Sequence, residues 1–258
     1  MSTIVVSDAA SIGTITFNQP DTRNALTTEM MSEVSAALAA WEPRPEIRAV
    51  ILTGAGSTFC AGADLKTLGR LLDNTTEENR RDSERMAGFF RAVYLYPKPV
   101  LAAVNGPAYG GGCGVISACD LAVAADTATL SYSEVRLGFV PAIVMTFLLR
   151  SVGEKRSKEL LLTGRLIDAQ TALNFGLYNA VVPADQLLEK TLELAREVIA
   201  NSPTALAVTK TLMAHIQGHT LDEALAMAVE RNAFVRTTRD FREGITAFLE
   251  KRKPKWKD

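Results

Sequence analysis

Two glycine-rich turns stand out in this 258-residue sequence as places where chemistry could occur. The first turn runs from Cys60 to Leu65 and the second from Ala108 to Gly114, and each follows a predicted buried strand. Each places small residues where a helix is expected to begin, and N–H groups at a helix start have no partner within the helix. Two such groups aimed at one point could stabilise a developing oxyanion. Glycines in such segments more often allow a tight turn or close packing than form a binding site. The pattern alone favours this structural interpretation.

Glu134 is the carboxylate that stands out. It lies in a largely apolar stretch, from Leu130 to Pro141, with little charge around it. A carboxylate held in an apolar cleft has a pKa raised toward neutrality and can exchange protons with a substrate. A surface glutamate paired with Arg136 is an equally good interpretation of the composition, so both remain open here.

Nucleotide-binding and histidine-based sites have weaker support. The stretch from Gly110 to Gly114 lacks the G-x-G-x-x-G spacing of a dinucleotide site, and no Walker A pattern occurs. His215 and His219 are four residues apart, but no H-E-x-x-H motif contains them, so solvated helix positions are expected. A serine or cysteine nucleophile would have no histidine base in the first part of the chain.

The cysteines do not predict a metal site or a disulfide framework. There are three, Cys60, Cys113 and Cys119, an odd number without paired ligand spacing. We therefore expect buried free thiols and no metal.

The elements that must position these turns alternate between strands and helices, which indicates an α/β fold. After Pro141 the pattern is mostly helical, with Asp168 and Thr220 as expected helix N-caps and Gly164 and Gly176 as helix stops. A shift in composition near residues 201–203 suggests a core over residues 1–200 and a helical C-terminal segment over residues 201–258. The sequence predicts a hairpin of residues 3–6 and 13–17, strands at 49–53, 100–104 and 121–124, and helices at 28–41, 76–96, 110–118, 155–163, 168–175, 184–200, 203–215, 221–234 and 240–251.

Composition narrows the range of partners. With 28 basic and 29 acidic residues the formal net charge is −1, which argues against nucleic acid or an acidic membrane as the main partner. No apolar stretch reaches the roughly 20 residues of a membrane span, and the first residues lack the basic and apolar regions of a signal peptide. We therefore expect a cytoplasmic protein.

Several motifs together resemble the crotonase (enoyl-CoA hydratase/isomerase) superfamily. They occur in the expected order over nearly the whole chain, and they are specific for the superfamily rather than for one reaction. The motifs are Arg23-Asn24-Ala25-Leu26, Phe59 to Lys66, Lys98 to Gly106, Tyr109 to Asp120, Ser133-Glu134-Val135-Arg136-Leu137-Gly138 and Glu243 to Arg252.

The resemblance implies a spiral of ββα units, a C-terminal helical trimerisation segment and a homotrimer or a homohexamer built from two trimers. It implies a coenzyme A thioester as substrate, with no cofactor beyond the coenzyme A that the substrate carries. The backbone N–H groups of Ala63 and Gly111 would hold the thioester oxygen, and Glu134 would be the acid/base. The remaining implied substrate-binding residues are Ala25, Ala61, Asp64, Leu65 and Lys66, together with Lys251 of a neighbouring subunit.

One departure bears on the reaction. Hydratases of this family usually carry a second glutamate, which would fall at Gly114 in this sequence, and Pro141-Ala142-Ile143 replaces a common glycine pair and would change the acyl pocket. The first hypothesis is a hydratase of 2-enoyl-CoA thioesters, with 3-methylglutaconyl-CoA of leucine/isovalerate metabolism as a candidate substrate. The second is a Δ3,Δ2-enoyl-CoA isomerase with Glu134 as the sole proton shuttle. The third is a non-catalytic acyl-CoA binder or, from the basic residues 251–255, an RNA-associated scaffold.

Overall fold

The computed structural model describes residues 2–64, 69 and 71–256. A six-stranded sheet with the order β1-β2-β3-β4-β6-β9 forms the centre of the core. β1 and β2 form the predicted antiparallel hairpin, and all later neighbours in this sheet pair in parallel. The strands are β1 (Ile4–Ala9), β2 (Ile12–Phe17), β3 (Ala49–Gly54), β4 (Val100–Val104), β6 (Leu121–Ala125) and β9 (Ala180–Val182).

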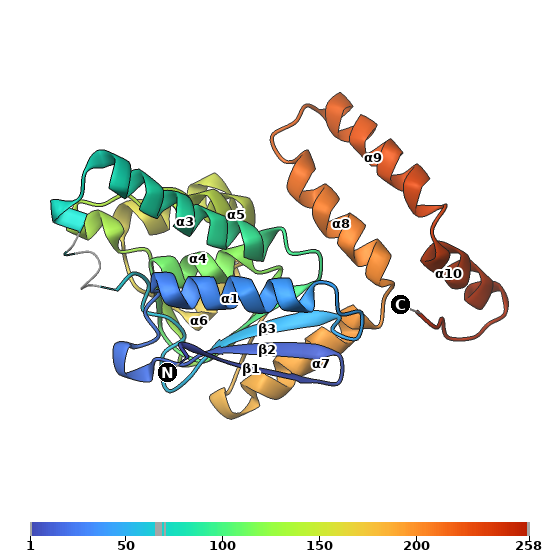
Figure 1. The fold of residues 1–258 in the computed structure, drawn as a ribbon, viewed down its shortest axis with the longest axis horizontal. Helices are drawn as coiled ribbons and strands as arrows, with labels where there is room; N and C mark the ends of the chain where they lie inside the picture. The colour runs from blue at the N-terminus through green and yellow to red at the C-terminus, as the bar shows by residue number, and fades with distance from the viewer. Residues whose placement is uncertain (1, 65–68, 70, 257–258) are drawn as a thin grey trace.

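Both faces of the sheet are covered, which explains the uninterrupted apolar runs of β3 and β4. Successive side chains of a strand point to opposite faces. Val50 and Leu52 therefore belong to one hydrophobic cluster, whereas Ala49 and Ile51 belong to another with Leu187. The first cluster packs under α1 (Thr28–Trp41) and α3 (Thr76–Tyr94), and the second under α7 (Leu187–Ile199) on the opposite side (Figure 1).

A small second sheet contains the start of the second glycine-rich turn. It contains β5 (Ala108–Tyr109), β7 (Thr129–Ser131) and β8 (Ile167–Asp168), in the order β5-β7-β8. β4 and β5 precede helix α4 (Gly111–Ala118), and β6 and β7 precede helix α5 (Ala142–Thr163), so a unit of two strands and a helix recurs along the chain. This recurrence is the ββα spiral that the resemblance implies.

Helix ends follow the expected capping chemistry. The Thr27 hydroxyl accepts a hydrogen bond from the Met30 N–H at the start of α1, and Asp168 caps α6 (Ala169–Phe175) in the same way. Thr220 forms a capping box at the start of α9 (Leu221–Val235), and Gly164 and Gly176 end α5 and α6 in left-handed conformations, as predicted. Short 3₁₀ turns complete the core: η1 (Pro20–Thr22), η2 (Leu71–Asp73), η3 (Glu134–Leu137) and η4 (Ala184–Gln186).

The last three helices stand to one side of the core (Figure 1). They are α8 (Pro203–Ile216), α9 (Leu221–Val235) and α10 (Arg239–Leu249). An ion pair of 2.6 Å between Lys210 of α8 and Asp120 of the core joins the two parts. Large apolar side chains of α9 and α10 remain exposed, namely Leu221, Leu225, Val229, Phe234, Phe241, Ile245, Phe248 and Leu249. No helix in the described ranges has the length and apolar character that a membrane crossing requires.

Candidate active site

The two glycine-rich turns lie against each other. The Tyr109 N–H donates a 3.0 Å hydrogen bond to the carbonyl of Cys60, and the Leu26 N–H donates one of 2.7 Å to the carbonyl of Gly62. A Cβ on Gly62 would stand 2.4 Å from the Tyr109 carbonyl oxygen and 3.1 Å from the Gly111 nitrogen, and its φ is +79°. Only glycine combines a positive φ with the absence of a Cβ, so Gly62 is needed for the close packing of the two turns. The same turns form the candidate site.

Two backbone amides border one small space between these turns. Gly111 is the first residue of α4, so its N–H has no acceptor within the helix. The point where a Gly111 Cβ would stand lies 4.0 Å from the Ala63 nitrogen, so the two amides lie on neighbouring segments. Neither N–H has a hydrogen-bond acceptor among the residues that the structure describes. The two amides therefore lie near each other at the positive end of the α4 dipole, where negative charge is stabilised.

Glu134 faces the same end of α4. It is the first residue of η3, and its Oε1 lies 3.0 Å from the point where a Cβ of Gly110, the N-cap of α4, would stand. Burial raises the pKa of the Glu134 carboxyl. Its Oε2 is buried and has no hydrogen-bond partner within the described ranges. A carboxylate in this state binds a proton more readily than an exposed one, as general acid/base chemistry requires.

The alternative of a surface glutamate paired with Arg136 is wrong. Glu134 is half-buried, and the described part of the chain shows no ion pair between the two residues. The Arg136 Nε lies instead against Gly164, 3.2 Å from where a Cβ of that glycine would stand.

Position 114 has no space for a side chain. A Cβ on Gly114 would lie 2.3 Å from Cγ1 of Val144 and 3.0 Å from Cε1 of Phe90. Val144 is in the first turn of α5, in a stretch where the sequence predicted no helix before residue 155. The place where the resemblance implies a second glutamate in hydratases is therefore filled by an apolar wall, formed by Val144 and Phe90.

The implied substrate-binding residues fall into three groups. Ala25 and Ala61 lie on segments that run side by side, and the Ala61 N–H donates a 2.9 Å bond to the carbonyl of Arg23. Asp64 follows Ala63 directly at the site, whereas Leu65 and Lys66 lie outside the described residues.

Lys251 follows α10, and Figure 1 shows α10 apart from α4, beyond α8. Within one chain, α10 is therefore distant from the turn at the start of α4. The assignment of Lys251 to a neighbouring subunit's nucleotide stays a prediction.

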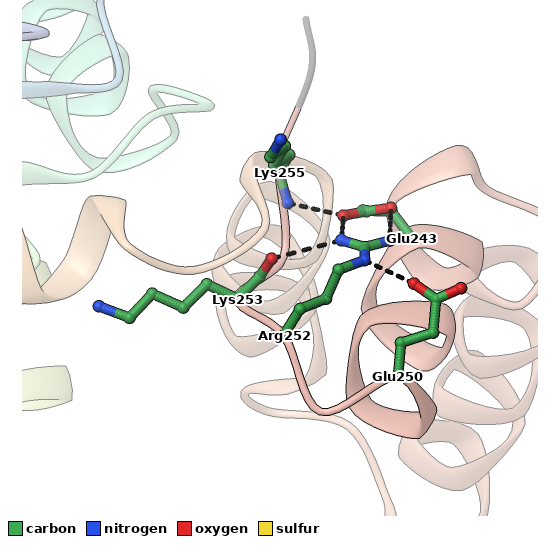
Figure 2. Close-up of polar contacts among 5 residues, drawn as sticks. All are labelled: Glu243, Glu250, Arg252, Lys253 and Lys255. Atoms are coloured by element: carbon green, nitrogen blue, oxygen red, sulfur yellow. Dashed lines mark hydrogen bonds and ion pairs between the residues drawn. The ribbon is translucent and has the colours of Figure 1, made fainter.

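The basic tail is partly neutralised. Figure 2 shows Arg252 between Glu243, which it contacts through Nη1 at 2.6 Å and Nη2 at 3.0 Å, and Glu250, which its Nε contacts at 2.6 Å. These contacts hold the pKa of Glu243 down at about 2. The Arg252 guanidinium is therefore committed to protein carboxylates, which weakens the hypothesis of an RNA-associated scaffold.

Other polar groups near the site have structural roles. The Tyr132 hydroxyl is fully buried, lies 2.8 Å from Ser117 Oγ and donates a 3.2 Å hydrogen bond to the Cys113 carbonyl. Cys60 and Cys113 are buried free thiols, and burial raises the pKa of Cys60 to about 12. Over the described residues, no three His, Cys, Asp or Glu side chains gather in a way that could hold a metal ion.

Comparison with known proteins gives a consistent family. The family described as enoyl-CoA hydratase/isomerase matches residues 7–258. A putative enoyl-CoA hydratase of Thermus thermophilus is 46% identical over 98% of this chain and 100% of its own length. A short-chain-enoyl-CoA hydratase of Clostridium acetobutylicum is 34% identical over 98% of this chain and 97% of its own.

Comparison with solved structures indicates the same family. An enoyl-CoA hydratase from Bacillus anthracis superposes with a TM-score of 0.91 at 36% identity, covering 99% of both chains. One from Polaromonas sp. JS666 gives a TM-score of 0.93 at 34% identity, covering 98% of this chain and 99% of the other. The chain has the crotonase α/β fold with a helical C-terminal region, and it belongs to the enoyl-CoA hydratase/isomerase family.

Proposed function

We propose that this protein is an enoyl-CoA hydratase that adds water across the C2–C3 double bond of a 2-enoyl-CoA thioester, or catalyses the reverse dehydration. The observation that carries the proposal is the buried Oε2 of Glu134 near the amides of Ala63 and Gly111, three groups that have no hydrogen-bond partner among the described residues. The hydratase names of the relatives from Thermus and Clostridium support the same reaction.

In this mechanism the two amides bind the thioester oxygen and stabilise the negative charge that develops there. One well-placed donor of this kind typically contributes about 3 kcal/mol to transition-state stabilisation. Glu134 takes a proton from water while the water oxygen bonds to C3, and the π electrons move toward the thioester oxygen. The enolate then collapses, and C2 takes the proton back from the Glu134 carboxyl. One carboxylate serves both steps if water and C2 lie on the same side of the substrate.

The second candidate, a Δ3,Δ2-enoyl-CoA isomerase, is favoured by the filled space at Gly114. Val144 and Phe90 leave no room there for a second carboxylate to hold water. Glu134 alone would remove a proton from C2 of a 3-enoyl-CoA and return it to C4, through the same enolate. This reaction breaks and forms only C–H bonds and needs no bound water.

One assay separates these possibilities. Purified protein is incubated with crotonyl-CoA, 3-methylglutaconyl-CoA or 3-hexenoyl-CoA while the ultraviolet absorbance of the conjugated thioester is followed. Loss of absorbance with either conjugated substrate supports hydration, and detectable turnover removes the hypothesis of a non-catalytic binder. A gain with 3-hexenoyl-CoA and no loss with the others would replace the hydratase by the isomerase. No change with any substrate would refute both.

We further propose that the protein assembles into a trimer or a hexamer through residues 201–258 and works in the cytoplasm without nucleic acid. The exposed apolar side chains of α9 and α10 support assembly, because such surfaces on a water-soluble chain are usually covered. In the assembly, Lys251 would reach the nucleotide of a substrate on the neighbouring subunit. Sedimentation analysis tests the assembly, and a monomer at micromolar concentration would refute it.

A further inference from the structure

One face of α4 leads from the candidate oxyanion site to an apolar wall. Gly110 and Gly114 are four residues apart and therefore lie on the same face of the helix. Glu134 stands over this face at Gly110, and Val144 and Phe90 stand over it at Gly114. Neither glycine has a side chain, so at these two positions α4 places nothing between Glu134 and the wall.

The wall is firmly packed. Val144 is 4% exposed and Phe90 is fully buried. The Phe90 ring is held by Phe89 at 5.2 Å and by Phe147 at 5.9 Å between ring centroids. Displacing either wall residue would require the surrounding α3 and α5 side chains to repack, and well-packed interiors resist this.

The position of the wall limits the acyl chain. In the proposed function the thioester oxygen lies at the Gly111 N–H, and the carbons that react lie next to Glu134, over the same face. The wall stands about one helical turn further on, where Gly114 follows. One turn is about 5.4 Å long, and with carbon–carbon bonds of about 1.5 Å it accommodates roughly four carbon atoms of an extended chain.

We propose that Val144, backed by Phe90, is a specificity-determining residue that restricts the enzyme to short-chain acyl-CoA thioesters. This inference rests on the proposed function, because it needs the thioester to be held at Ala63 and Gly111. In this proposal Val144 closes the end of the acyl pocket in addition to packing in the core.

The test is a chain-length series with two variants and a control. Values of kcat/KM are measured for crotonyl-, hexenoyl-, octenoyl- and decenoyl-CoA with the wild type, Val144→Ala and Val144→Ile. A matched control is Val34→Ala, another buried valine, which lies in α1. The wild type is expected to prefer crotonyl-CoA and to lose efficiency steeply with length.

Val144→Ala is expected to raise the octenoyl-to-crotonyl ratio by about tenfold or more, as a methylene-sized change in a pocket typically does. Val144→Ile is expected to lower the efficiency with hexenoyl-CoA relative to crotonyl-CoA, and Val34→Ala to leave the profile unchanged. A wild-type profile that is flat to decenoyl-CoA overturns the proposal, and so does a profile that neither Val144 variant changes.

A second measurement keeps this inference separate from the proposed reaction. Calorimetric dissociation constants are determined for butanoyl-, hexanoyl-, octanoyl- and decanoyl-CoA, which cannot be hydrated. Tight binding of the short chains with weak binding of the long ones supports the wall even if no substrate is turned over, in which case only the proposed reaction fails. Equal affinity for all four chains overturns the wall.

Discussion

Replacing Glu134 by glutamine is the most informative perturbation of the proposed chemistry. Glutamine keeps the length and shape of the side chain against Gly110 but cannot take up or release a proton at neutral pH. The amides of Ala63 and Gly111 are untouched, so binding of the thioester oxygen persists.

The expected loss of kcat follows from the role of Glu134 in proton transfer. General acid/base catalysis typically contributes a factor of about 10² to 10⁴, which at 1.36 kcal/mol per tenfold is about 3 to 5 kcal/mol of activation free energy. The assay is kcat with crotonyl-CoA, together with the dissociation constant of butanoyl-CoA. We expect kcat to fall by that factor while the dissociation constant changes by less than about threefold. Glu84→Gln, an exposed glutamate on α3, is the control.

A Glu134→Gln variant with full turnover would show that Glu134 does not carry the proton in the reaction. A loss of butanoyl-CoA binding as large as the loss of kcat would equally contradict this role of Glu134, since the effect would then be structural.

The buried carboxyl also makes a prediction about pH. Burial raises the pKa of Glu134 above its ordinary value of 4.5, so the folded state holds this proton at pH values where the unfolded chain has lost it. The carboxyl therefore contributes stability that is present below pH 4.5 and lost as the pH rises through the folded-state pKa. Thermal unfolding should show Glu134→Gln gaining stability relative to the wild type between acidic and neutral pH. A constant difference would show that the carboxyl is not perturbed.

Three other variants test the geometry around the site. Gly114→Ala should cost about 1 to 3 kcal/mol of stability by overpacking against Val144, and Gly114→Ala combined with Val144→Ala should recover most of it; additive losses in urea denaturation would contradict the contact. Gly62→Ala should lower kcat by about tenfold or more, because the new Cβ would press on the Tyr109 carbonyl beside the Gly111 amide; unchanged kinetics would show that this contact is not tight. Lys210→Met should lower the melting temperature more than Arg196→Met at an exposed ion pair, since Lys210 is 12% exposed; an equal or smaller shift would show that the Lys210 pair does not join α8 to the core.

The fold could be predicted well where local chemistry decides it. The helix caps Asp168 and Thr220, the glycine stops and the apolar runs of β3 and β4 all occur where the residues indicated them. The start of α5 was missed because residues 142–149 are almost uniformly apolar and show no helical period, and because Gly153 (φ +76°, ψ 174°) kinks the helix. The short strands β5 and β8 have two residues each, too few for a periodic signal.

The candidate site could be predicted in its parts but not in its assembly. The turns at Gly62 and Gly111 and the carboxylate of Glu134 could be named from the sequence, but their contact depends on pairing between distant segments. The wall at Gly114 was not predictable, because Phe90 comes from a helix whose sequence pattern indicates only burial, and Val144 from the unrecognised start of α5.

In the proposed mechanism, two backbone amides hold one oxygen while a single carboxyl moves the proton. A crystal structure with bound butanoyl-CoA tests both parts of this arrangement. We predict a thioester oxygen about 2.7 to 3.1 Å from both the Ala63 and the Gly111 nitrogen, with C2 facing the carboxyl of Glu134. A thioester oxygen that contacts neither nitrogen, or an acyl chain on the side away from Glu134, would contradict the account.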